Sequence, residues 1–148
     1  MDIIKKKYEL APPSDDVIIE YNPLCHESVA GKAAGRIKDI YYKPTIVLTD
    51  SEDEGYIKGS ARSVEGFDIF ERILGVSDLL SRFGGHPMAA GLTLKKSNLE
   101  EFIRRMNEPP WPEEAERFKR VTIDAAVVFS ALSRQAVDEL ELIEPCGK

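Results

Sequence analysis

The chain has 148 residues and a net charge of −6, from 20 basic and 26 acidic side chains. This length suits one domain with a short extension, and 43% hydrophobic residues exclude a disordered composition. The acidic balance argues against a protein that coats nucleic acid with uniform positive charge, but it allows a locally basic groove. No apolar run reaches the roughly 18 residues of a transmembrane helix, so the sequence predicts no membrane partner.

The cysteines and histidines limit the chemistry of the chain. Two cysteines, Cys25 and Cys146, make no disulfide framework, so we expect a reducing, cytoplasmic environment. The two histidines, His26 and His86, are 60 positions apart with no third. We therefore expect no metal site built mainly from imidazoles on this chain.

The first half of the chain predicts alternating strands and helices. Residues 1–16 look like a leader that ends in a proline-rich turn, and the β-branched run at 17–21 predicts a buried strand. Residues 28–40 carry apolar side chains at helical spacing, on Val29, Ala33, Ile37 and Ile40. Gly31 and Gly35 weaken this helix, so each should have a packing or contact reason.

A hairpin and two short helices are predicted next. Residues 45–49 and 56–62 predict two strands joined by an acidic turn. Helical patterns follow at about 68–74 and 76–83, and Gly84-Gly85-His86-Pro87 breaks them. Residues 91–95 predict a fourth strand.

The last part of the chain predicts one well-defined helix and a weaker extension. Ser97 and Glu100 form a capping box, which opens a helix with an apolar face made of Leu99, Phe102, Ile103 and Met106. Residues 109–112 predict a stiff proline-rich linker. A strand at 121–129 and a helix at 133–143 follow, and the chain then ends on a turn, so we expect it to be cut from a longer protein.

Together these patterns predict an α/β fold with a mixed β-sheet flanked by helices. We divide it into a leader (1–16), a main domain (17–108), and a linker with the start of a further domain, a β-barrel (109–148).

The sharpest motif is the run from Phe83 to Gly91, which contains Gly84, Gly85 and His86. Adjacent glycines let backbone N–H groups converge on an anion, and a nearby histidine can donate a hydrogen bond to phosphate. The alternative is a tight helix-to-strand turn with an incidental histidine.

Two further segments could bind an anion. Ser60 and Arg62 end a predicted strand, and a hydroxyl with a guanidinium suits a phosphodiester backbone; the alternative is an ordinary polar strand end. His26 lies just before a predicted helix, whose N-terminus favours anions, with Ser28 as its cap. Cys25 and His26 do not make a zinc site, because no second ligand pair exists.

The acidic turn at 50–55 has the start of a calcium-binding EF-hand loop, with acids at its first, third and fifth positions. The bidentate glutamate required at position 12 is replaced by Ala61. We therefore expect a solvated hairpin turn.

Several segments taken together resemble one family. These are Cys25 to Arg36, Tyr41 to Leu48, Gly59 to Phe67, and Asp78 through Gly84-Gly85-His86 to Leu92. They are similar to the second core domain of the RecJ family of bacterial single-strand-specific DNA exonucleases. The resemblance is close over residues 17–108 and continues more loosely to Gly147.

The resemblance implies a division of labour between two domains. In that family an N-terminal domain holds two Mn²⁺ or Mg²⁺ ions, and the domain seen here closes over it with single-stranded DNA between them. By position, Gly84, Gly85 and His86 contact phosphate near the metals, and Ser60 and Arg62 contact the DNA backbone. The parent would be a 5′-to-3′ exonuclease of DNA repair and recombination, and the present chain alone would be inactive.

The resemblance departs from the family pattern at one loop. The family usually has Trp-His-Pro where this chain has Cys25-His26-Glu27, so His26 matches by position only. Two other functions are compatible with the sequence. The chain could belong to another phosphoesterase of the same superfamily, which degrades oligonucleotides or cyclic dinucleotides. It could also be a stand-alone phosphate-binding module.

Overall fold

The computed structural model describes residues 13–108, 110–111, 123, 126–129 and 133–141. In chain order the described elements are β1 (Ile18–Tyr21), α2 (Glu27–Tyr41), β2 (Thr45–Asp50), β3 (Tyr56–Arg62), α3 (Ile69–Leu74), the 3₁₀ turn η1 (Ser77–Leu79), β4 (Leu80–His86), β5 (Ala89–Lys95), the 3₁₀ turn η2 (Lys96–Asn98), α4 (Leu99–Asn107) and α5 (Arg134–Glu141).

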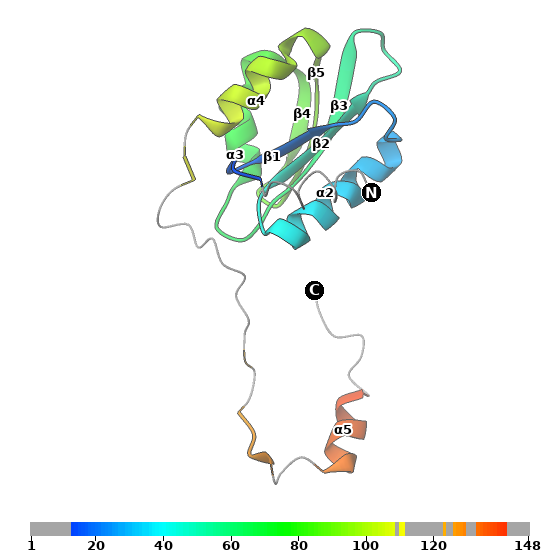
Figure 1. The fold of residues 1–148 in the computed structure, drawn as a ribbon, viewed down its shortest axis with the longest axis vertical. Helices are drawn as coiled ribbons and strands as arrows, with labels where there is room; N and C mark the ends of the chain where they lie inside the picture. The colour runs from blue at the N-terminus through cyan, green and yellow to red at the C-terminus, as the bar shows by residue number, and fades with distance from the viewer. Residues whose placement is uncertain (1–12, 109, 112–122, 124–125, 130–132, 142–148) are drawn as a thin grey trace.

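The five strands form one mixed sheet in the order β1-β2-β3-β5-β4 (Figure 1). β1 pairs with β2 in parallel, and the other three pairs are antiparallel. The predicted α/β class with a mixed sheet is therefore confirmed. Among the described residues no helix is long and apolar enough to cross a membrane.

Helix α2 covers one face of the sheet over its β1 side. Ala30, Ala34 and Ile37 are buried against Ile18 and Val47. The buried stripe is rotated from the predicted one, because Val29 and Ile40 are about half exposed. α2 packs on β2 and β3. No described element covers the same face of β5 and β4.

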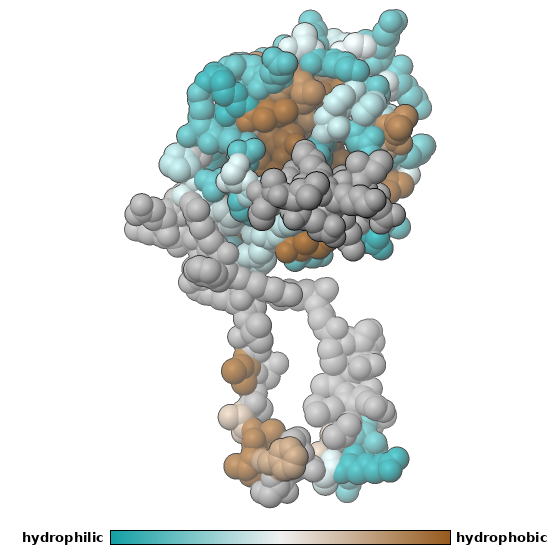
Figure 2. Space-filling view, in the orientation of Figure 1, coloured by the Kyte–Doolittle hydropathy of each residue, from teal (hydrophilic) through white to brown (hydrophobic). Residues whose placement is uncertain are grey.

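The opposite face carries the larger core. Phe102 and Met106 of α4 and Ile73 of α3 are fully buried there, in one cluster with side chains of β2, β3 and β5. The predicted apolar face of the helix at 99–106 is thus confirmed. In Figure 2 hydrophobic residues gather in the middle of the domain, with hydrophilic residues around them.

The predicted helix at 76–83 is wrong. Residues 77–79 form a single 3₁₀ turn, and 80–86 form strand β4 at the edge of the sheet. Leu79, Leu80 and Phe83 have a spacing that mimics a helical face, but pairing with β5 decides the structure. Gly84, Gly85 and His86 therefore lie within a strand, and the predicted helix-to-strand turn is replaced by a strand-to-strand hairpin.

Two predicted helix caps are also wrong. α4 begins at Leu99 with Asn98 as its N-cap, and Ser97 lies in the preceding 3₁₀ turn, so the capping box does not form. The N-cap of α2 is His26 rather than Ser28. The Nδ1 atom of His26 accepts a hydrogen bond from the Ser28 backbone N–H at 3.3 Å.

The predicted linker at 109–112 contains a core residue. Trp111 is only 2% exposed, and its ring packs edge-on against Phe67 with centroids 5.2 Å apart. Its backbone N–H donates to Asp16 Oδ2 at 2.7 Å. Lys43 Nζ donates to the carbonyls of Pro13 and Asp15, at 2.8 and 2.7 Å, so the end of the predicted leader is attached to the domain.

The extension is described only in part. Residues 123 and 126–129 of the predicted strand at 121–129 are not in a strand, and the rest of it lies outside the described residues. α5 agrees with the helix predicted at 133–143. Residues 1–12 of the predicted leader also lie outside the described range.

Candidate functional site

Side chains of β3, β5 and β4 form three rows on one face of the sheet. Because side chains alternate along a strand, residues two apart share a face, and the pairing register aligns them across strands. The face is the one that α2 covers at β2, since Val47 lies opposite Ser60. The rows are Arg62–Ala89–His86, Ser60–Gly91–Gly84 and Lys58–Thr93–Arg82.

A groove of about 380 Å³ runs between the first turns of α2 and this face. Ser60 and Gly84 line it, together with Lys58, Arg82 and Thr93. A Cβ atom built on Gly84 would meet no atom within 4 Å. The middle of the floor is therefore bare backbone, which a ligand can approach closely.

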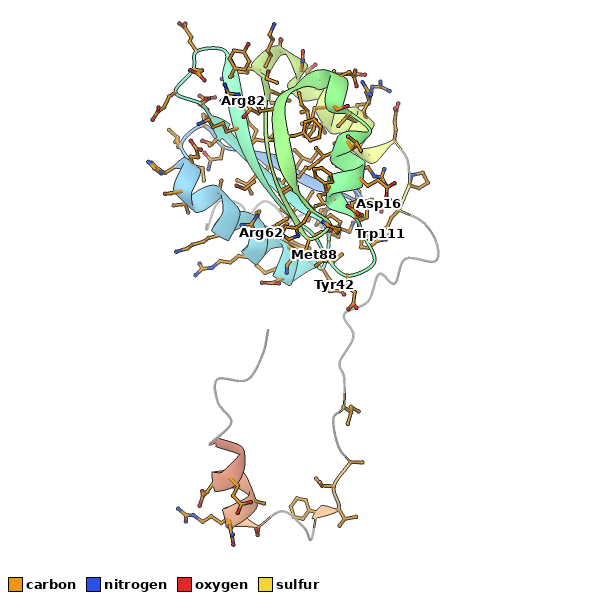
Figure 3. All side chains as sticks on the ribbon, turned by 180° about the vertical axis from the view of Figure 1, so that it is seen from behind. Asp16, Tyr42, Arg62, Arg82, Met88 and Trp111 are labelled. Carbon is orange, nitrogen blue, oxygen red and sulfur yellow. The ribbon has the colours of Figure 1, made fainter. Side chains whose placement is uncertain are left out.

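Arg62 is the last residue of β3 and lies beside Met88 (Figure 3). The side chain is partly buried, and its Nη1 donates to the carbonyl of Ala61 at 2.8 Å. No carboxylate of the described residues pairs with this guanidinium. Arg62 does not line the groove itself but lies one row beyond Ser60 on the same face, where no described carboxylate neutralises its charge.

Two serines of the same segment behave differently. Ser60 is partly exposed and lies on the face of the groove. Ser63 is buried, and its hydroxyl donates to the carbonyl of Phe67 at 2.6 Å. Of the two hydroxyls, only that of Ser60 can reach a ligand.

His86 is exposed at the end of the edge strand β4. Its Nδ1 accepts a weak hydrogen bond from the N–H of Met88 at 3.4 Å, which in the neutral ring leaves the proton on Nε2. The hairpin that carries it is bonded to both ends of the loop between β3 and α3, since the Ser63 N–H donates to Met88 O at 2.9 Å and the Ile69 N–H to Pro87 O at 3.1 Å. The ring is therefore held on a well-supported turn.

Gly85 differs from its neighbour Gly84. It pairs with Ala90, so a side chain at this position would point to the opposite face of the sheet. Its φ is 157°, and a Cβ would lie 2.4 Å from Ala89 O and 2.5 Å from Ala90 Cα. The hairpin itself requires glycine at this position.

His26 lies apart from these rows. It lines a separate pocket of about 260 Å³ with Leu24, Cys25 and Val29, and its Nδ1 is also 2.8 Å from Ser28 Oγ. The structure thus brings Ser60, Arg62, Gly84 and His86 to one face and leaves His26 at the helix cap.

Lys58 and Arg82 are basic residues that sequence patterns alone did not single out. Lys58 Nζ is 3.0 Å from Glu27 Oε2, and this hydrogen bond and charge raise the pKa of the lysine. Arg82 is exposed and has no carboxylate partner among the described residues. The two-residue spacing of Lys58, Ser60 and Arg62 was a usable signal, whereas the incorrect helix at 76–83 concealed Arg82.

The described part of the chain offers no metal centre. No three His, Cys, Asp or Glu side chains in it come together as ligands. Glu27 is the carboxylate that lines the groove, and it is engaged by Lys58. Hard divalent ions such as Mg²⁺ need several oxygen ligands, so these residues do not fit such an ion by themselves.

A mixed sheet with helices on both faces, and with a Gly-Gly-His strand beside an open groove, defines the chain as an α/β domain. Residues 14–109 match the family model described as "DHHA1 domain", and the chain belongs to this family.

Several proteins similar to this chain are RecJ proteins. The "Single-stranded-DNA-specific exonuclease RecJ" of Bacillus subtilis (strain 168) is 36% identical over 121 residues, which cover 80% of this chain and 15% of the relative. A crystal structure of RecJ in complex with Mg²⁺ from Thermus thermophilus is similar, with a TM-score of 0.74, 28% identity and coverage of 99% of this chain and 23% of that one. The Mn²⁺ complex from the same source has a TM-score of 0.73, with 28% identity and coverage of 99% and 22%.

The predicted resemblance to RecJ is thus confirmed. The chain spans less than a quarter of the length of these relatives.

Proposed function

We propose that this domain is the substrate-binding half of a RecJ-like, single-strand-specific 5′-to-3′ DNA exonuclease of DNA repair and recombination. The domain binds the phosphate backbone of single-stranded DNA. It closes over two Mn²⁺ or Mg²⁺ ions held by an N-terminal domain of the same cytoplasmic protein. The observation that carries this proposal is the alignment of Ser60, Arg62, Gly84 and His86 on one open face.

Each of these groups suits a phosphodiester. The Arg62 guanidinium supplies a charged donor without a described carboxylate partner, and Ser60 supplies a hydroxyl beside it. His86 presents Nε2–H, while Gly84 keeps the floor free of side chains. None of these contacts reads a base, so binding is independent of sequence.

The rows also suggest the path of the strand. Residues two apart along a β-strand are about 6.6 Å apart, so the rows form a ladder of polar groups. Figure 3 shows Arg62 and Arg82 at opposite ends of it. A strand that meets phosphate contacts at Arg62 and His86 would leave the groove past Arg82.

The test is the affinity of the full chain for a 5′-phosphorylated single-stranded oligodeoxynucleotide, measured by fluorescence anisotropy. Arg62→Ala should weaken binding by about tenfold, since a hydrogen bond to a charged group contributes roughly 1.5–3 kcal/mol. The loss should be the same for different base sequences. Because few phosphates are contacted, affinity should also fall moderately as salt rises.

Arg104→Ala is the matched control, because it removes the same charge from α4 on the opposite face. There Arg104 pairs with Glu101 at 2.5 Å and lies away from the groove. This variant should bind within about twofold of the unmodified chain. Equal losses for the two variants would mean that net charge, rather than this face, governs binding.

The chain alone should not hydrolyse DNA in the presence of manganese, since the residues described here do not fit the ions. Cleavage that depends on His86 would contradict the proposed division of labour.

A further inference from the structure

Gly31 of α2 and Arg62 of β3 are in contact where the helix packs on the strand. Gly31 lies in the second turn of α2, facing the end of β3. A Cβ atom built on it would lie 2.8 Å from Arg62 Nη2 and 3.5 Å from Arg62 Cζ. It would also lie 3.7 Å from Ser60 Oγ. Two of the side chains proposed to bind phosphate, Ser60 and Arg62, therefore lie next to the position that a Gly31 side chain would occupy.

The shortest of these distances has a clear steric meaning. Carbon atoms of real side chains essentially never approach another heavy atom to 2.8 Å, so any residue larger than glycine must displace something. The displaced atom is the end of a long, flexible side chain, not backbone. A larger residue at this position should therefore move the guanidinium while the domain stays folded.

Gly35 shows what an ordinary glycine in this helix looks like. It lies one turn further along α2, and a Cβ there would meet nothing within 4 Å. We expected a contact reason for both glycines, and the structure provides one only for Gly31. At position 31 the new methyl group would be too close to the guanidinium of Arg62, and at position 35 it would have no such contact.

We propose that Gly31 is a positioning residue for Arg62. Its missing side chain forms the slot in which the guanidinium lies between α2 and β3, close to Ser60 and held by the carbonyl of Ala61. A guanidinium that is held in place before the ligand arrives loses less conformational entropy when it binds an anion. The inference rests on the proposed phosphate-binding function of Arg62.

The experiment is a double-mutant cycle on the full chain, with Gly31→Ala, Arg62→Ala, the double variant, and Gly35→Ala as control. Binding of a 5′-phosphorylated single-stranded oligodeoxynucleotide is measured by anisotropy at low salt. Gly31→Ala should weaken binding about fivefold, and Gly35→Ala less than about twofold. In the Arg62→Ala background, Gly31→Ala should have no further effect.

The double-mutant cycle distinguishes a displaced Arg62 guanidinium from a methyl group that blocks the groove. If the new methyl group simply blocked the groove, it would weaken binding in the Arg62→Ala background too, and the proposal would be overturned. It would equally be overturned if Gly31→Ala bound like the unmodified chain while Arg62→Ala did not. A loss of fold is not expected, because alanine favours helix more than glycine does.

Urea unfolding of the same four variants keeps the inference separate from the proposed function. Alanine at position 31 should stabilise the Arg62→Ala background more than the unmodified one, because only the latter must move a guanidinium. If Arg62→Ala left DNA binding intact, the proposed function of Arg62 would fail. The difference in the free energy of unfolding between the two backgrounds would still decide whether Gly31 positions Arg62. If the effects of Gly31→Ala and Arg62→Ala on the free energy of unfolding were additive, the proposed role of Gly31 would be rejected.

Discussion

Gly84 and Gly85 are neighbours in sequence, but the fold uses them for different purposes. A Cβ atom built on Gly84 would point into open space over the groove, whereas one built on Gly85 would collide with the backbone of β5. Adjacent residues in a strand point to opposite faces, which is why one dipeptide can serve a ligand and a hairpin at once. In the proposed function, Gly84 opens the floor and Gly85 allows the hairpin that presents His86.

We predict that Gly85→Ala destabilises the domain by about 2 kcal/mol or more, because it adds strain in φ to a clash with backbone atoms. Gly84→Ala should change the free energy of unfolding by less than about 1 kcal/mol. Urea denaturation of both variants checks this. Equal destabilisation would mean that the strand tolerates neither substitution, and the two glycines would then not differ in role.

At the scale of elements, α4 holds the start of β4. Arg105 donates two hydrogen bonds to Asp78, from Nη1 to Oδ2 at 2.7 Å and from Nη2 to Oδ1 at 2.9 Å. Nη2 also donates to the carbonyl of Gly75 at 3.2 Å. The last turn of α4 is thus joined to both ends of the segment between α3 and β4. This link steadies the edge strand that carries Gly-Gly-His.

This link should make stability depend on pH in the acid range. The hydrogen bond from Arg105 lowers the pKa of Asp78 below its ordinary value of 3.8. A lowered pKa in the folded state stabilises the protein above the unfolded value, and the contribution is lost as the pH falls through the folded value. We therefore predict that Asp78→Asn is less stable than the unmodified chain at about pH 6, and that the difference shrinks towards about pH 3.

Urea denaturation of the two proteins at both pH values measures the effect. Asp39→Asn is a suitable control, because Asp39 pairs with its neighbour Lys38 on the exposed side of α2. A difference for Asp78→Asn that stayed constant with pH would show that the ion pair is not its source.

At the scale of the whole molecule, the described core closes at Trp111. The larger core cluster runs from Val17 to this residue, which packs on Phe67 and bonds to Asp16. Residues from the two ends of the main domain thus meet, and Trp111, which follows α4, belongs to the fold.

We predict that a chain ending at residue 112 unfolds within a few degrees of the full chain, whereas one ending at residue 108 is strongly destabilised. Loss of a buried tryptophan typically costs about 3–5 kcal/mol. Thermal unfolding followed by circular dichroism compares the three chains. If the chain ending at 108 were as stable as the full one, Trp111 would not be part of the stabilising core.

Local sequence was sufficient for several parts of the site. The hairpin of β2 and β3 follows from two β-branched runs around an acidic turn, and this places Ser60 and Arg62 on one face by alternation alone. The sequence also singled out Gly84, Gly85 and His86 as candidates, because glycine and histidine have few roles in such a motif. The edge strand that carries them was not, because Leu79, Leu80 and Phe83 match a helical spacing equally well.

By itself the sequence determined the α/β class, the helix α2, the hairpin and the family resemblance, since these depend on short-range patterns and motifs. Only the tertiary structure decided that β4 pairs with β5, that Arg82 shares a face with Arg62, that Gly31 makes room for a guanidinium, and that Trp111 completes the core. Each of these depends on contacts between residues far apart in the chain. Local propensity cannot choose among such contacts, because backbone pairing and close packing decide them only when the whole domain has assembled.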